Sequence, residues 1–252
     1  MQNRKNKNTL SNITILIIGI MIMGGALSAA TVANFTEGFG TSSWDQYTGK
    51  AGGGWQSAWV ISGEGLFGQI VSSSELDRGG NYLNGSMNVK EGVKEAFFAR
   101  EWDTSALKET GIVKISWKWR MDSRSFGHGD RICFQEGTSS RSTFNIFAYG
   151  TPVNNTAPRQ FMFFDGDKKG NFDNSQMVDS GMTMIPGTVY TFTVTLNQRT
   201  KTWTAAISDG KKTVESQPLG FRSGRDISGE LRIGMQAKAK IINFSVDAIS
   251  ID

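Results

Sequence analysis

The chain has 252 residues, a formal net charge of +4, 30 glycines, 4 prolines, one cysteine and one histidine. A single cysteine excludes an internal disulfide, and one cysteine with one histidine excludes a zinc centre built from those two residue types. The many glycines, with short β-rich runs between them, indicate strands joined by tight turns.

Residues 1–30 have the three-part organisation of a secretory signal peptide. Basic residues open the chain, Ile13–Met23 is an apolar run, and small residues follow in GGALSAATVA. The apolar run is shorter than the roughly 20 residues that span a bilayer. We therefore expect cleavage after Ser28 or Ala30, a secreted protein (extracellular, periplasmic or at the cell surface), and no membrane partner after cleavage.

The positive charge lies largely in this export segment. Residues 1–30 carry three basic residues and no acids, so removing them lowers the net charge from +4 to about +1. Without a clustered basic face, we expect no nucleic-acid partner. The remaining residues, 31–252, have a length typical of one all-β domain, and they contain no internal repeat or linker.

Strand-like runs recur at intervals of roughly ten residues, and no helical segments alternate with them. The runs are Ala33–Phe39, Leu66–Val71, Ala96–Ala99, Val113–Met121, Arg131–Gln135, Thr143–Tyr149, Gln160–Phe164, Gln176–Asp179, Val189–Asn197, Thr202–Ser208, Glu230–Gln236 and Ile241–Ile251. Only SALKETG is expected to form a short helical turn. This pattern predicts an antiparallel two-sheet sandwich and not a parallel α/β sheet.

The opening loop is rich in aromatic residues: Trp44, Tyr47, Trp55 and Trp59. Such residues either form a platform for sugar rings or pack over the edge of the sandwich, and we favour packing.

The stretch Ile112–Met121, IVKISWKWRM, is the clearest amphipathic strand. At a period of two, one face holds Val113, Ile115, Trp117, Trp119 and Met121, and the other holds Lys114, Ser116, Lys118 and Arg120. We expect the tryptophans to lie in the core between the sheets and the cationic face to meet solvent.

Two consecutive runs, Thr188–Asn197 and Thr202–Ser208, predict a hairpin through QRTK. Tyr190, Phe192, Val194 and Leu196 supply one apolar face, which Trp203, Ala205 and Ile207 match on the returning strand.

The two most reactive residue types are each present once. We interpret Cys133 as a small strand residue, because a nucleophilic thiol would need a basic partner and the only histidine is His128, in the preceding loop. His128 beside two glycines is typical of solvated surface, although a general base in a sugar-cleaving site is the alternative.

Three motif-like stretches are better explained as turns. Gly63–Gly68, GEGLFG, matches a dinucleotide-binding spacing, but the following QIVSSS is strand-like and not helical. Glu75–Asp77 supplies only part of the acid set of a laminarinase-type catalytic strand. Asp165–Asp173 resembles a calcium loop but carries Lys169 at its fifth position, so we expect a polar hairpin tip.

The mature chain resembles secreted concanavalin A-like (laminin G-like) jelly-roll domains. The resemblance runs from Phe35 to Asp252 and rests on FTEGFG…W…GGGW…W, VKISWKWRM, YTFTVTLNQRTKTWTAAISDG and the closing FSVDAISID. It implies two curved antiparallel sheets, with glycans or other ligands commonly bound on the concave one.

The two ends of the chain also resemble those of jelly-roll carbohydrate-binding modules. There, an acid near the first strand and an aspartate on the last strand help to hold a structural calcium ion. Glu37 and Asp247 occupy the matching places, so the resemblance implies calcium as the cofactor and these two as ligands. A solvent-exposed pair on adjacent terminal strands is the alternative.

We therefore expect a secreted, non-catalytic module that binds a polysaccharide or other glycan. If Ile112–Met121 is a concave strand, Lys118 and Arg120 point into the ligand face together with Arg131 and Gln135 from the next strand. Cationic side chains there would favour acidic polysaccharides.

The alternative function is a polysaccharide lyase or glycoside hydrolase acting in the same cleft through Arg120, His128, Tyr149 or an acid. The Arg, Gln-x-His and Tyr-Lys motifs of alginate-lyase-like jelly rolls are not found in the sequence. A matrix protein that assembles through its sheet edges is a third hypothesis.

Overall fold

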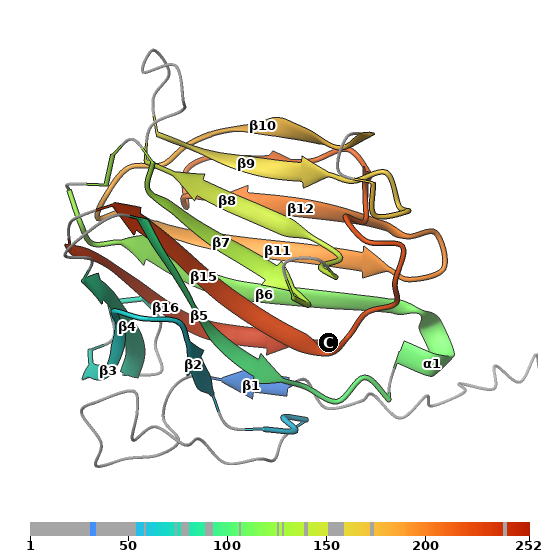
Figure 1. The fold of residues 1–252 in the computed structure, drawn as a ribbon, viewed down its shortest axis with the longest axis horizontal. Coiled ribbons are helices and arrows are strands. Elements are labelled where there is room, and N and C mark those ends of the chain that lie inside the picture. Colours follow the sequence, from blue (N-terminus) through green and yellow to red (C-terminus); the bar gives the residue numbers. More distant parts are fainter. Residues whose placement is uncertain are drawn as a thin grey trace, which may run out of the picture.

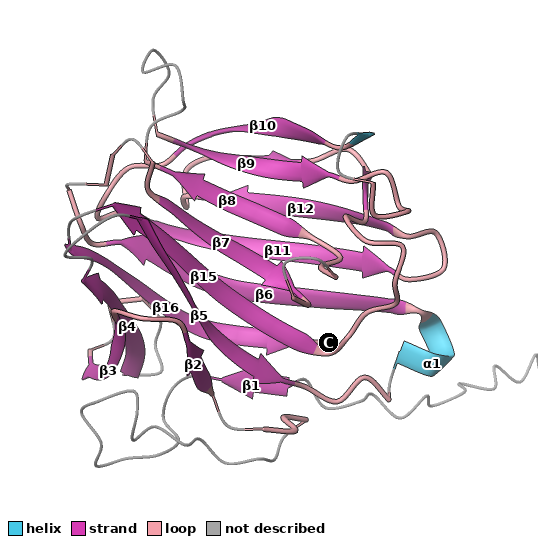
Figure 2. Cartoon of the chain, viewed as in Figure 1, coloured by secondary structure: helices cyan, strands magenta, loops and turns pink. Residues whose placement is uncertain are grey.

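Two antiparallel β-sheets pack face to face with one hydrophobic core between them (Figure 1). The computed structural model describes residues 31–33, 54–57, 59–73, 75–76, 81–88, 93–105, 107–124, 126–127, 129–138, 141–150, 159–171, 174–238 and 241–252. Within them, helix α1 (Leu107–Thr110) is one short turn, as SALKETG predicts, and the rest is strand and loop (Figure 2). The predicted all-β sandwich is confirmed.

The strands fall into a nine-stranded and a seven-stranded sheet. The nine-stranded sheet contains, in order, β13 (Thr213–Glu215), β12 (Thr202–Ser208), β11 (Val189–Asn197), β6 (Ile112–Met121), β16 (Ile241–Ile251), β4 (Asn81–Asn88) and β3 (Leu66–Ser72), with β1 (Thr31–Ala33) beside β16 and β14 (Leu219–Gly220) beside β12. The seven-stranded sheet contains β10 (Gln176–Thr183), β9 (Gln160–Asp165), β8 (Asn145–Tyr149), β7 (Arg131–Glu136), β15 (Glu230–Lys238), β5 (Val93–Glu101) and β2 (Val60–Ser62).

Strands that follow one another in the chain often change sheet. β6 pairs with β11 and β16, whereas β7 pairs with β8 and β15, so the β6–β7 connection crosses from one sheet to the other. The predicted hairpin, by contrast, is confirmed: β11 and β12 pair from Thr191 opposite Ser208 to Asn197 opposite Thr202.

Strand β4 is not predicted by the sequence, because NYLNGSMN has no β-branched residue and only one aromatic residue, Tyr82. It is held as a strand by pairing with β3 on one side and β16 on the other. A Cβ at Gly85 would lie 2.4 Å from the ring of Phe244 on β16, so only glycine leaves room for that buried ring.

Aromatic side chains fill the space between the sheets. Trp117 is 3% exposed and stacks on Phe192 of the same sheet at 4.9 Å between ring centroids, with the planes 2° apart. It also contacts Phe134 of the opposite sheet at 5.1 Å. Trp119 is fully buried and meets Phe134 and Phe161 edge-on. The prediction that both tryptophans belong to the core is confirmed.

The described part of the aromatic opening loop also packs and does not form a platform. Trp55 and Trp59 are buried, and their rings lie 4.5 and 5.8 Å from the guanidinium of buried Arg100. Trp44 and Tyr47 lie outside the described residues.

The motif-like stretches are turns. Gly63 and Gly65 have φ angles of 96° and 78° and connect β2 to β3 without a helix. Between β9 and β10, Asp167 accepts the backbone N–H groups of Lys169, Gly170 and Asn171. The expected polar hairpin tip is thus present, although Asp173 lies outside the described residues.

Residues 1–30 also lie outside the described residues, so the signal peptide stays a prediction. In the described part of the chain, no helix has the length and apolar character needed to cross a membrane.

A buried carboxylate fastens one end of the sandwich. Glu136, at the end of β7, accepts hydrogen bonds at Oε1 from the Ser228 N–H, the Ser228 hydroxyl and the Gly229 N–H, at 2.6, 2.7 and 2.8 Å. Its Oε2 accepts the Thr143 hydroxyl at 2.7 Å. Burial raises the pKa of Glu136 above its ordinary value of 4.5, although these four donors oppose the shift.

We predict that Glu136→Ala lowers the free energy of unfolding by about 2–4 kcal/mol, since it leaves four donors without this acceptor. Glu136→Gln keeps the shape and is expected to cost about 1 kcal/mol or less at neutral pH. Urea titrations of the three proteins measure both effects.

The pH dependence of stability gives a second test of the role of Glu136. Because the folded pKa of Glu136 is raised, its contribution to stability is complete below pH 4.5 and is lost as pH rises through the folded pKa. Glu136→Gln should remove that decline. An unchanged pH profile in the Gln variant would contradict the assignment.

Candidate functional site

A continuous line of polar side chains crosses the outer face of the seven-stranded sheet. It comprises Gln160 on β9, Tyr149 on β8, Arg131 on β7, Gln236 on β15 and Glu95 on β5, each directly opposite the next in the strand ladder. We call these five residues the outer row. The first four are partly exposed and the last is exposed, so the row is open to solvent.

Strand alternation fixes this orientation. The chain neighbours of the outer row are core residues that point inward, namely Phe161, Ala148, Ile132, Met235 and Ala96. Because successive side chains on a strand point to opposite faces, the outer-row residues must point away from the core. Strands β9, β8, β7, β15 and β5 lie side by side across the front sheet (Figure 1).

Aromatic rings lie beside the row on the same face of the sheet. Phe147, two positions before Tyr149 on β8, is buried with Cys133 and Phe164, and Tyr149 packs against this cluster. The Arg131 guanidinium lies 5.5 Å from the Phe147 ring, and the Tyr149 ring lies 5.6 Å from it. Arg131 also pairs with Glu95 at 3.5 Å. These contacts hold the guanidinium in place while its side chain remains 34% exposed.

The row offers both donors and acceptors for hydrogen bonds. The guanidinium donates, the carboxylate accepts, and the two amides and the phenol do both. Four strand spacings of about 4.8 Å give the row a length of about 19 Å, which suits an extended polar ligand better than a single small molecule.

Two of the predicted site residues, Arg131 and Gln135, lie on this face, but only Arg131 is open to solvent. Gln135 lies on the same side of β7 as Arg131, yet it is 2% exposed. Its amide donates to the Gly137 carbonyl at 2.7 Å, and its Oε1 accepts from Asn145 at 2.9 Å. The prediction that Gln135 lines an open ligand face is wrong, because its polar atoms are already used in the fold.

The prediction that Lys118 and Arg120 share this face is also wrong. Both lie on β6, which belongs to the nine-stranded sheet, and they point outward on the opposite side of the sandwich from Arg131. Sequence alternation gave their orientation correctly, but it could not show that β6 and β7 lie in different sheets. Whether either residue binds a ligand stays a prediction.

The residues named for the enzymatic alternative are separated in the same way. Arg120 and Tyr149 lie on the outer faces of different sheets, so they cannot act in one cleft. His128 lies outside the described residues.

The thiol of Cys133 is held in the protonated form. It is buried beside Gln135 and Asn145, and burial raises its pKa to about 12. Since the thiolate is the reactive species, this supports the expectation of a small strand residue over a nucleophile.

We predict that Cys133 does not react with a thiol reagent such as dithionitrobenzoate at pH 8 in the native protein and reacts fully in denaturant. The reaction is followed by absorbance. Rapid labelling of the folded protein would contradict the buried position of the thiol.

The proposed calcium ligands are only partly described. Asp247 is buried on β16, directly opposite Lys118, and Glu37 lies outside the described residues. Among the described residues, no three His, Cys, Asp or Glu side chains gather where they could hold a metal ion. Of the two predicted ligands, the described residues include only Asp247.

Calcium binding stays a prediction that melting temperatures can test. If Glu37 and Asp247 hold a structural ion, a chelator should lower the melting temperature by several degrees and added calcium should restore it. An unchanged melting temperature would count against the site.

One carboxylate pair also lies on the outer face of the seven-stranded sheet. Glu101 on β5 is directly opposite Glu230 on β15, and Glu230 pairs with Arg232 at 2.5 Å. The sequence does not single out either residue, because they are 129 positions apart in the chain and only the pairing of β5 with β15 brings them together.

The same reason explains why most of the outer row was missed. Gln160, Gln236 and Glu95 have no motif around them, and their significance comes from cross-strand register alone. The alternation in β15, where Leu231, Ile233 and Met235 are apolar, was the only local sign that Gln236 points outward.

Comparisons with known proteins give similarity of fold only. No protein-family model matches the chain, and no curated protein sequence matches it. Among solved structures, a carbohydrate esterase from the Shiga toxin-encoding bacteriophage phi24B is similar, with a TM-score of 0.49, 13% identity, and coverage of 77% of this chain and 89% of that one.

Two further solved structures are similar at the same level. Peanut lectin has a TM-score of 0.43 and 14% identity, with 78% of this chain and 98% of that one covered. The alginate lyase from Klebsiella pneumoniae has a TM-score of 0.45 and 8% identity, with 73% and 83% covered. At these values the likenesses carry no argument about function.

Proposed function

We propose that the protein is a secreted, non-catalytic module of the concanavalin A-like class that binds a polysaccharide through the outer row. The supporting observation is the line of two amides, one phenol, one guanidinium and one carboxylate across five adjacent strands. Sugar hydroxyl groups both donate and accept, and such a mixed row matches them along its length.

A rigid support strengthens the proposal. All five residues lie on strands, and Arg131 is held between the Phe147 ring and Glu95. A preorganised site loses less side-chain entropy on binding than a site on loops. The partly exposed Tyr149 ring adds an aromatic surface beside the guanidinium, which suits the apolar face of a sugar ring.

Acidic glycans are the preferred ligands within this proposal. Arg131 can form two parallel hydrogen bonds to a carboxylate or sulfate, which a lysine cannot match. Arg131 is already paired with Glu95 at 3.5 Å, so an acidic ligand would compete with that carboxylate. We therefore expect weaker binding of neutral glycans than of acidic ones, and both through the same row.

The test is a glycan array followed by calorimetry on the strongest ligand. Arg131→Ala/Gln236→Ala should weaken binding at least about tenfold, since loss of one charged hydrogen bond costs about 1.5–3 kcal/mol. Melting temperatures check that each variant folds.

Lys118→Ala is the matched control, because it removes one cation from the opposite sheet. It should leave binding unchanged. If Lys118→Ala abolishes binding and the double variant does not, the ligand face belongs to the nine-stranded sheet.

A glycoside hydrolase is the second candidate, and Glu101 opposite Glu230 is the observation that favours it. Two carboxyl groups flanking one bond are what glycoside hydrolysis needs. The binding proposal predicts no new reducing or unsaturated ends in any retained glycan. If ends appear and either Glu101→Gln or Glu230→Gln stops their formation, the hydrolase replaces the binding module.

A further inference from the structure

A polar hollow lies at one end of the nine-stranded sheet, away from the outer row. Its volume is about 230 Å³, and it is lined by Arg120, Asp122, Arg124, Pro186 and Gly187. These residues come from the end of β6, the loop that follows it and the turn before β11.

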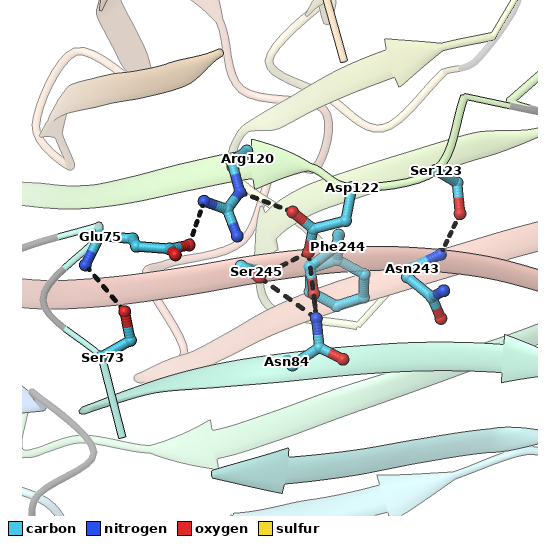
Figure 3. A network of polar contacts seen from close by, with 9 residues as sticks. All are labelled: Ser73, Glu75, Asn84, Arg120, Asp122, Ser123, Asn243, Phe244 and Ser245. Atoms are coloured by element: carbon cyan, nitrogen blue, oxygen red, sulfur yellow. Dashed lines mark hydrogen bonds and ion pairs between the residues drawn. The ribbon is translucent and has the colours of Figure 1, made fainter. Parts of the chain in front are cut away.

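A network of hydrogen bonds fixes the inner wall of this hollow (Figure 3). The Arg120 Nε donates to Asp122 at 2.6 Å, and its Nη1 donates to Glu75 at 2.9 Å. Asp122 Oδ2 accepts from the Asn84 amide at 3.0 Å and from the Ser245 hydroxyl at 2.5 Å. Arg120 and Asp122 therefore hold their positions before any ligand arrives.

Backbone contacts hold the outer wall. The Gly187 N–H donates to the Met121 carbonyl at 2.7 Å, which ties the turn before β11 to the end of β6. The Arg159 guanidinium donates to the Arg124 carbonyl at 2.7 Å and so fixes the loop that carries Arg124. The hollow is thus built from anchored segments.

The charges around the hollow are unevenly paired. Arg120 and Arg124 are the two cations of its lining, and the carboxylates Asp122 and Glu75 both pair with Arg120. Arg120 already faces two carboxylates, whereas no ion-pair partner of the exposed Arg124 guanidinium is found among the described residues. An anionic group is therefore expected at Arg124.

Size limits the ligand further. At about 230 Å³, the hollow is smaller than the roughly 300–1,000 Å³ pockets of drug-sized ligands. One wall is the apolar ring of Pro186, next to Ile185, which is 54% exposed. A single sugar ring has this combination of small size, apolar face and polar edge.

We propose that this end hollow binds one hexuronate residue. Its carboxylate pairs with the Arg124 guanidinium, and its ring hydroxyl groups donate to Asp122 and accept from the remaining N–H groups of Arg120. The end hollow is separate from the outer row, since the two lie on different sheets, and it does not depend on the function proposed for the row.

The experiment titrates the full chain with sodium glucuronate, followed by calorimetry and by backbone amide shifts in NMR. Wild type should bind glucuronate in the millimolar range and glucose at least about tenfold more weakly, because glucose lacks the carboxylate. Arg124→Ala should weaken glucuronate at least about tenfold, and Arg124→Lys by less. Lys211→Ala, in the exposed turn between β12 and β13, is the matched control and should leave this binding unchanged. Arg131→Ala tests whether the outer row, and not the end hollow, takes the uronate.

Four results would overturn the proposal. They are no glucuronate binding by wild type in the millimolar range, equal affinity for glucuronate and acetate, unchanged affinity in Arg124→Ala, and loss of affinity in Arg131→Ala. Equal affinity for acetate would mean a simple anion site. Loss of glucuronate affinity in Arg131→Ala would place uronate at the outer row. If instead no polysaccharide binds at the outer row, the proposal for the end hollow is unaffected.

Discussion

The aromatic contacts of Trp117 and Trp119 hold the two sheets together, and the rest of the structure depends on them. Both side chains project from β6 into the space between the sheets and meet rings from β7 and β9 on the opposite sheet. Removing one such buried ring costs about 3–5 kcal/mol, a large part of the stability of a typical domain. Once these rings face inward, the alternation of β6 commits Lys118 and Arg120 to the outside.

The same rule, applied to the other sheet, produces the outer row. Phe134 and Phe161 point into the core from the seven-stranded sheet and contact Trp119. Their strands therefore present Arg131 and Gln160 on the outer face. The proposed ligand face thus depends on the core indirectly. The inward residues set the orientation of each strand, and the register between strands sets which outward residues become neighbours. The register between strands aligns the five residues of the outer row, whereas the end hollow is formed by loops that are hydrogen-bonded to the end of β6.

The sequence predicted what alternation can reveal. The core role of Trp117 and Trp119, the β11–β12 hairpin and the outward orientation of four cationic or amide residues all follow from a period of two. It did not predict β4, whose glycine is needed because the Phe244 ring passes over it. It also did not predict the sheet partners, since the step from β6 to β7 changes sheet and the sequence around residues 122–130 carries no sign of it. Consequently Lys118 and Arg131 were assigned to one face although they lie on two.

The most direct measurement is a crystal structure of the protein with the strongest glycan ligand from an array. The account predicts sugar rings along the outer row, with hydrogen bonds to Arg131, Tyr149 and Gln236. Sugar bound only on the nine-stranded sheet, with the outer row still in solvent, would contradict it.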